Sequence, residues 1–123
     1  MKHETERWLT MADEDLRAAQ VLHREGFYSH CVFYSHLAVE KSLKALLLEF
    51  TNVEVPPYTH NLHHLSRLVG IAMPEPMVEF FAILSPHSIA ARYSDPESYT
   101  EAFAEDNLGR SEEAIIWLRQ LLR

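Results

Sequence analysis

The sequence predicts an all-α protein, an up-and-down four-helix bundle with one additional short helix. Three observations carry this prediction. The stretch from Tyr28 to Leu48 is apolar, with only three fully charged residues and no Gly or Pro to interrupt it. Gly occurs only 3 times in 123 residues, which favours long helices over many turns. Helix-length segments are separated by candidate breaks at Gly26, Pro56-Pro57, Gly70 to Pro76 and Asp95-Pro96.

The first two helices are expected from about Glu4 to Arg24 and from Tyr28 to between Phe50 and Asn52. Gly26 can end the first helix because glycine reaches left-handed backbone angles at little cost. The break is short, so the second helix should return antiparallel to the first. In the second helix, apolar residues three and four positions apart form a wide stripe, as expected of the centre of a bundle: Val32, Phe33, Leu37, Leu43, Leu46 and Leu47.

Three more helical segments follow the two prolines. Thr59 or Asn61 can cap a short third helix. A fourth should begin around Glu75 and be kinked or restarted at Pro86, since proline cannot continue a helix without strain. The segment from Ser98 to Glu101 has the spacing of a capping box at the start of the last helix.

Composition predicts one globular domain over residues 1–123, with 47% hydrophobic and 24% charged residues. The single Cys31 excludes an intrachain disulfide and, within an apolar helix, is expected to be a buried thiol. Polar residues break the apolar run well short of a membrane span, and the charged N-terminus is unlike a signal peptide. We therefore expect a cytoplasmic protein without membrane association.

The formal net charge of -7 argues against broad DNA or other non-specific nucleic-acid binding, which needs a basic face. It permits a local basic pocket or docking to a basic partner protein. Eight His residues raise the question of a metal, and His60, His63 and His64 lie three and four apart. A zinc site needs more strong ligands than these, so no metal and no cofactor are predicted.

Four motifs occur in order along the chain. The second helix contains SHLAVEKSLKALL, and Thr59-His60 and Arg92-Tyr93-Ser94-Asp95 follow it. Trp8, Ala12, Asp15-Leu16 and Ala19 precede it. Together they resemble the HEPN domain family of small helical domains over nearly the whole chain, which implies a HEPN-like helical bundle.

Many HEPN proteins are ribonucleases whose motif is an Arg and a His separated by four to six other residues, and the resemblance places this Arg at Arg92. The residues at the required spacing are Glu97, Ser98 and Tyr99, and none of them is His. Arg17…His23 and Arg24…His30 have the spacing but lie elsewhere in the chain. General acid–base cleavage needs a group that exchanges protons near neutral pH, so we expect no efficient ribonuclease activity.

The candidate binding residues are Arg92, Tyr93 and Asp95 at a helix end, with Glu40, Lys41 and Lys44 of the second-helix motif. Arginine can grip a phosphate, tyrosine can stack on a base, and the two lysines can add positive charge to a cleft. The structural alternatives are that Arg92 pairs with Asp95 or Glu40, that Tyr93 packs at the edge of the core, and that the lysines form a solvated stripe.

The resemblance implies a nucleotide- or RNA-binding module that acts with a minimal nucleotidyltransferase, in substrate binding or as part of a toxin–antitoxin pair. It also implies a homodimer with the Arg92 motifs of two subunits near the dimer axis. The alternatives are a HEPN-type RNA endonuclease with altered catalytic residues and a structural dimerisation domain.

Overall fold

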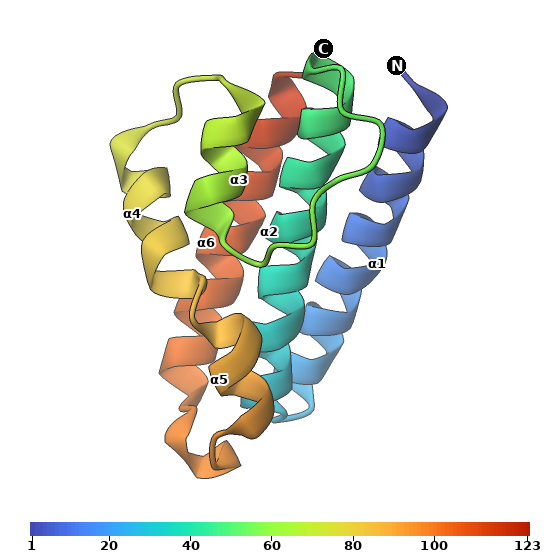
Figure 1. The fold of residues 1–123 in the computed structure, drawn as a ribbon. Helices are drawn as coiled ribbons and strands as arrows, with labels where there is room; N and C mark the ends of the chain where they lie inside the picture. Colours follow the sequence, from blue (N-terminus) through green and yellow to red (C-terminus); the bar gives the residue numbers. More distant parts are fainter.

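The computed structural model describes residues 1–123, and every regular element in it is helical. The first two helices and the last run side by side, while the shorter helices cover one side of the second (Figure 1). The all-α bundle predicted from the sequence is therefore confirmed. In chain order the elements are α1 (His3–Arg24), α2 (Tyr28–Phe50), α3 (Leu62–Val69), α4 (Glu75–Leu84), α5 (His87–Tyr93), the short 3-10 helix η1 (Pro96–Ser98) and α6 (Glu101–Gln120).

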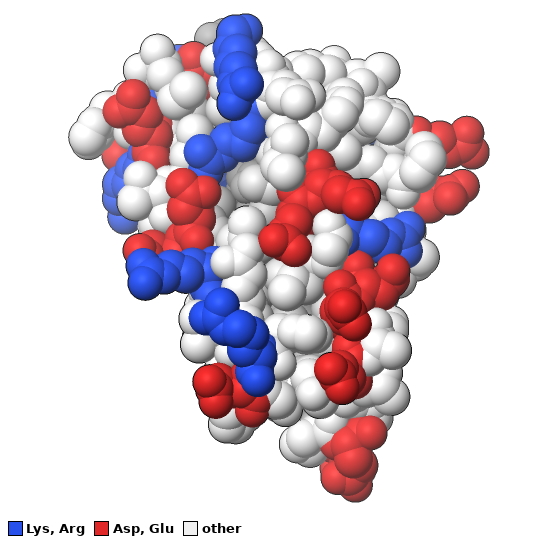
Figure 2. Space-filling view, turned by 180° about the vertical axis from the view of Figure 1, so that it is seen from behind, with Lys and Arg blue, Asp and Glu red and all other residues white.

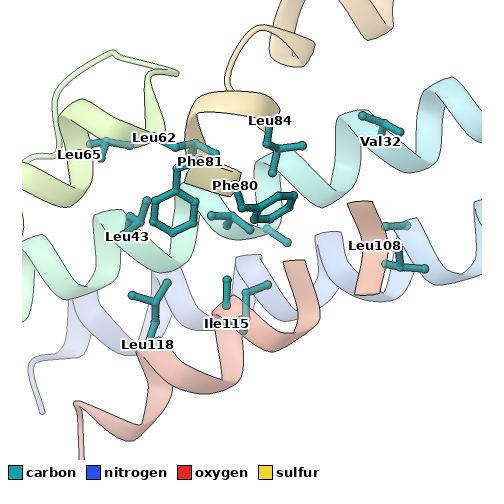
Figure 3. Packing of buried hydrophobic residues seen from close by; sticks show 14 of the residues in the cluster. Val32, Leu43, Leu62, Leu65, Phe80, Phe81, Leu84, Leu108, Ile115 and Leu118 are labelled. Carbon is teal, nitrogen blue, oxygen red and sulfur yellow. The ribbon is translucent and has the colours of Figure 1, made fainter. Parts of the chain in front are cut away.

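Helix α2 is the centre of the bundle, because it contacts α1, α3, α5 and α6. Of its 23 residues, 15 are buried, which matches the wide apolar stripe in its sequence. Leu43 lies among core side chains from α3, α4 and α6 (Figure 3). Cys31 is fully buried as expected, and burial raises the pKa of its thiol to about 11.

The boundaries of the first three helices follow local backbone chemistry. Gly26 and Gly70 adopt positive φ angles of 84° and 80° just after α1 and α3. The side chain of Asn61 caps α3 by accepting a hydrogen bond from the His64 amide at 3.0 Å. Thr59, the alternative cap, instead accepts from the amide of Asn61 at 3.2 Å and so stabilises the turn before the helix.

The chain restarts after Leu84, since α5 begins at His87, directly after Pro86. The capping box predicted at Ser98 to Glu101 is wrong. Pro96 to Ser98 form η1, and the Ser98 hydroxyl donates to the carbonyl of Asp95. Helix α6 therefore begins two residues later than that capping box requires, with the side chain of Thr100 accepting from the amide of Phe103 at 3.1 Å.

The segment 51–61 leaves the end of α2, crosses its face and returns to the middle of the helix before α3 begins (Figure 1). This path brings residues just before α3 against the centre of α2. Both chain termini lie at the same end of the bundle (Figure 1). No helix combines the length and apolar character that crossing a membrane requires.

Candidate functional site

Arg92 lies in the last turn of α5, and its side chain is held in place without an ion pair. Its Nε donates to the carbonyl of Ser88, one turn earlier, at 2.7 Å. The guanidinium carbon lies 5.1 Å from the centre of the Phe33 ring and 5.4 Å from that of Tyr93. No carboxylate lies within ion-pair distance, so the suggested pairing of Arg92 with Asp95 or Glu40 is wrong.

A cavity of about 170 Å³ opens beside this guanidinium. Its walls come from the first turns of α2 and from the end of α5. The polar side chains around it belong to Ser29, His30, Arg92 and Ser94. Because the terminal nitrogens of Arg92 donate to no protein group, the cavity presents an unpaired positive charge beside an imidazole.

Of the residues that follow Arg92 in the motif, Ser94 lines this cavity, whereas Tyr93 and Asp95 do not. Tyr93 is 77% exposed, so the alternative that it packs at the edge of the core is wrong. Asp95 is exposed in the turn before η1, where its backbone carbonyl accepts from Ser98. The structure thus brings Arg92 and Tyr93 together and leaves the Asp95 carboxylate without an ion pair.

None of the residues at the spacing of the ribonuclease motif takes the place of the histidine that would exchange protons during RNA cleavage. Glu97 and Ser98 are exposed on η1. Tyr99 is buried, and its hydroxyl forms a hydrogen bond with Nδ1 of His87 at 2.7 Å. Burial raises the pKa of Tyr99 and lowers that of His87, so this pair is neutral near pH 7.

Glu40 and Lys44 lie elsewhere, in a buried charged network on α2. Their side chains are only 5% and 7% exposed, and Lys44 Nζ lies 3.0 Å from Glu40 Oε2. His60 Nδ1 donates to Glu40 Oε1 at 2.8 Å, so the carboxylate ties the segment before α3 to the central helix. Lys44 Nζ also lies 5.7 Å from the centre of the Trp8 ring on α1. These two residues hold helices together and do not reach the Arg92 cavity.

His36 also belongs to this network, and its side chain is fully buried. Its Nε2 donates to the backbone carbonyl of His60 at 3.0 Å, while its Nδ1 has no hydrogen-bond partner and lies 3.6 Å from Glu40 Oε1. Burial lowers the pKa of His36 to about 4, against the opposing effect of Glu40. The imidazole is therefore neutral at pH 7 although a carboxylate lies beside it.

Lys41 also reaches α1, where its Nζ lies 2.7 Å from Asp15 Oδ2. Neither predicted role, a free charge in a cleft or a solvated stripe, describes the two lysines, since each is paired with a carboxylate. No group of three His, Cys, Asp or Glu side chains is arranged to hold a metal ion.

His30 is the residue of this site that sequence reasoning missed. It lies in the first turn of α2, 62 positions before Arg92, and reaches the same cavity through the packing of α5 on α2. The Arg24…His30 spacing drew attention to it for another reason, since Arg24 is not part of this cavity. The signal that could have found it is a polar Ser-His pair at the start of the most buried helix.

Comparison with known proteins agrees with this geometry at the level of the fold and family. The family model described as HEPN domain matches residues 5–121. The chain belongs to the HEPN domain family. A search of curated proteins finds no match.

Two solved structures share the fold of this HEPN domain along its whole length. One is the crystal structure of TT1696 from Thermus thermophilus, with a TM-score of 0.85, 25% identity, and coverage of 97% of this chain and 98% of that one. The other is ST0689, described as an archaeal HEPN homologue, with a TM-score of 0.77, 25% identity and complete coverage of both chains.

Proposed function

We propose that this HEPN domain binds the phosphate of a nucleotide or RNA in the Arg92 cavity. The observation that carries the proposal is the unpaired guanidinium, fixed by Ser88 and by two aromatic rings beside a small cavity. A guanidinium grips a phosphate through two parallel N–H···O bonds, and fixing it beforehand reduces the entropy lost on binding.

The beginning of α2 adds to this attraction for an anion. The first intrahelical bond runs from the amide of Cys31 to the carbonyl of Phe27, so the amides of Tyr28, Ser29 and His30 precede it. The first turn contains no acidic residue. Unpaired amides and the positive end of the helix dipole both favour a negative group here.

The charge of the remaining surface argues for a local site rather than an extended nucleic-acid track. The chain has 18 acidic and 11 basic residues besides His. On the face shown in Figure 2, Lys and Arg side chains lie in small groups separated by Asp and Glu side chains and form no continuous basic patch. Binding through one arginine of a protein with this excess of acidic residues should be weak and should weaken further with salt.

Calorimetry with a panel of nucleotides and short RNAs is the direct test. Arg92→Ala should reduce affinity at least tenfold, since a charge-assisted bidentate contact contributes more than about 1.4 kcal/mol. Arg92→Lys should also impair binding, because lysine keeps the charge but loses the fork. Arg67→Ala is the matched control, since Arg67 is an exposed arginine of α3 that forms no ion pair. Equal heats for the wild type and Arg92→Ala would remove Arg92 from the site.

RNA cleavage is the second candidate function, and His30 is the observation that favours it, because it places an imidazole in the cavity of Arg92. Arginine keeps its proton at neutral pH, so His30 is the one group there that can exchange protons. Cleavage uses both a base and an acid, and we therefore expect binding without robust hydrolysis. The same RNAs should stay intact after incubation, and cleavage that is lost in His30→Gln would establish the ribonuclease instead.

We also propose that the protein forms a homodimer and acts with a minimal nucleotidyltransferase. Support for the homodimer comes from apolar side chains around the cavity: Phe27 is 54% exposed, Ile89 59% and Tyr93 77%. Ile89 and Tyr93 are four residues apart and share one face of α5, while the Phe27 ring lies 5.9 Å from that of His30. A dimer that covers this surface would place two Arg92 cavities near its axis, where an enzyme partner could reach a bound nucleotide.

Light scattering coupled to gel filtration tests this assembly. The protein alone should have twice the monomer mass across a wide concentration range, and adding a minimal nucleotidyltransferase from the same genome should shift it to a larger complex. Tyr93→Glu should favour the monomer, because a buried unpaired carboxylate is costly, whereas Tyr58→Glu, at a fully exposed tyrosine outside this surface, should not. A monomer mass at every concentration would contradict the dimer, and an unchanged peak after addition would contradict the partner.

A further inference from the structure

A second cavity, of about 530 Å³, adjoins the Arg92 cavity and shares His30 with it. It lies between the second half of α1 and the first half of α2. From α1 come Glu14, Arg17, Ala18, Val21 and Leu22, and from α2 come His30 and Tyr34. The volume falls within the range of about 300–1,000 Å³ typical of small-molecule sites, whereas the Arg92 cavity holds a single chemical group.

The two cavities are joined by aromatic packing as well as by His30. The Arg92 guanidinium lies on the ring of Phe33, and the Phe33 ring packs edge-on against Tyr34 with 5.4 Å between ring centres. Tyr34 in turn lines the larger cavity. A ligand that reaches from Arg92 past His30 would therefore meet the ring of Tyr34.

The chemistry of the walls sets the direction in which such a ligand binds. Glu14 and Arg17 place opposite charges at the larger cavity, which should therefore attract a phosphate less than the unpaired Arg92 does. Val21, Leu22 and Tyr34 suit a flat, largely apolar ring, and Glu14 and Arg17 offer an acceptor and a donor for the polar edge of a base. The phosphate belongs with Arg92 and the base belongs between α1 and α2.

We infer that the two cavities form one ribonucleotide site, with the phosphate against Arg92, the base between α1 and α2 beside Tyr34, and His30 at the junction. The inference rests on the proposed phosphate binding at Arg92 and adds the position of the base. Its ligand is a nucleoside monophosphate unit, either free or within single-stranded RNA.

Calorimetry with ribose 5-phosphate, AMP and a six-nucleotide single-stranded RNA distinguishes phosphate binding at the Arg92 cavity from base binding at the larger cavity. In the wild type, AMP should bind roughly tenfold more tightly than ribose 5-phosphate, which is within the contribution of a base that stacks on an aromatic ring. Ala18→Leu narrows the larger cavity without changing charge or helix propensity greatly. It should lower AMP affinity to that of ribose 5-phosphate and leave ribose 5-phosphate unaffected.

Three further variants complete the design. Val21→Gln, at a residue 39% exposed, repeats the Ala18→Leu test at a second wall position in case the leucine disturbs packing. Ala82→Leu is the matched control, since Ala82 is an exposed alanine of α4 outside both cavities. His30→Gln should weaken AMP and ribose 5-phosphate together, because His30 borders both cavities. Tighter binding of the RNA than of AMP would identify a strand as the ligand, and the reverse a free nucleotide.

These measurements test the position of the base separately from phosphate binding at Arg92. If Arg92→Ala abolishes AMP binding while Ala18→Leu and Val21→Gln bind like the wild type, the base lies elsewhere and the phosphate site stands. Wild-type affinity of His30→Gln for both ligands would break the link between the cavities. If the wild type binds none of the three ligands, both proposals fall.

Discussion

The substitution Glu40→Gln is expected to lower the free energy of unfolding by about 3–5 kcal/mol, the cost of removing one partner of a buried ion pair. The Lys44 ammonium lies 3.0 Å from the Glu40 carboxylate, and its side chain is only 7% exposed. With a neutral amide at position 40, this ammonium stays away from water without a counterion. His60 also loses the charged acceptor that ties the segment before α3 to α2.

Urea denaturation followed by circular dichroism measures this effect. Glu105→Gln, at an exposed glutamate of α6 that forms no ion pair, is the matched control and should change stability by less than about 0.5 kcal/mol. Adding Lys44→Met to Glu40→Gln should restore much of the loss, because a neutral replacement of the whole pair leaves no buried charge. A loss below about 1 kcal/mol in Glu40→Gln would mean that water reaches Lys44.

The helices were predictable because each depends on local chemistry. The apolar spacing of α2, Gly26 after α1 and the restart at Pro86 all act within a few residues. The error at Ser98, and the choice between Thr59 and Asn61 that the sequence left open, arose where two local motifs compete for the same turn. Thr59 and Ser98 have the chemistry of helix caps, but their hydroxyls are used in the preceding turn and in η1.

The site was only partly predictable, since its contacts join residues far apart in the chain. Arg92 and Tyr93 follow from the family motif, and both lie at the cavity or beside it. Glu40 and Lys44 have the same charges whether a helix is exposed or buried. Their burial depends on the path of residues 51–61, which brings His60 to Glu40 across 20 positions. The position of His30 beside Arg92 likewise depends on how α5 packs on α2.

A second large effect is expected from pH, because His36 is buried in its neutral form. Burial lowers the pKa of His36 from the ordinary 6.5 to about 4 in the folded protein. Between these values the unfolded chain binds a proton that the folded chain does not, so stability falls as pH decreases. His36 should therefore stabilise the fold fully above about pH 6.5. Roughly 3 kcal/mol of this stabilisation should be lost by about pH 4.

The unfolding free energy of the wild type and of His36→Gln, measured from pH 7 to pH 4, isolates this contribution. Glutamine can still donate to the carbonyl of His60 but binds no proton in this range. The groups that face or influence His36 are Glu40 and Lys44 on α2, His60 before α3 and His87 on α5. Burial also lowers the pKa of His87, which destabilises the protein in acid in the same direction. This effect is common to both proteins and cancels in the difference between their unfolding free energies.

The difference in unfolding free energy between the two proteins should shift in favour of His36→Gln by roughly 3 kcal/mol as the pH falls. Parallel curves would show that the buried imidazole accepts a proton without penalty, as a rearrangement that brings Glu40 into contact with Nδ1 would allow.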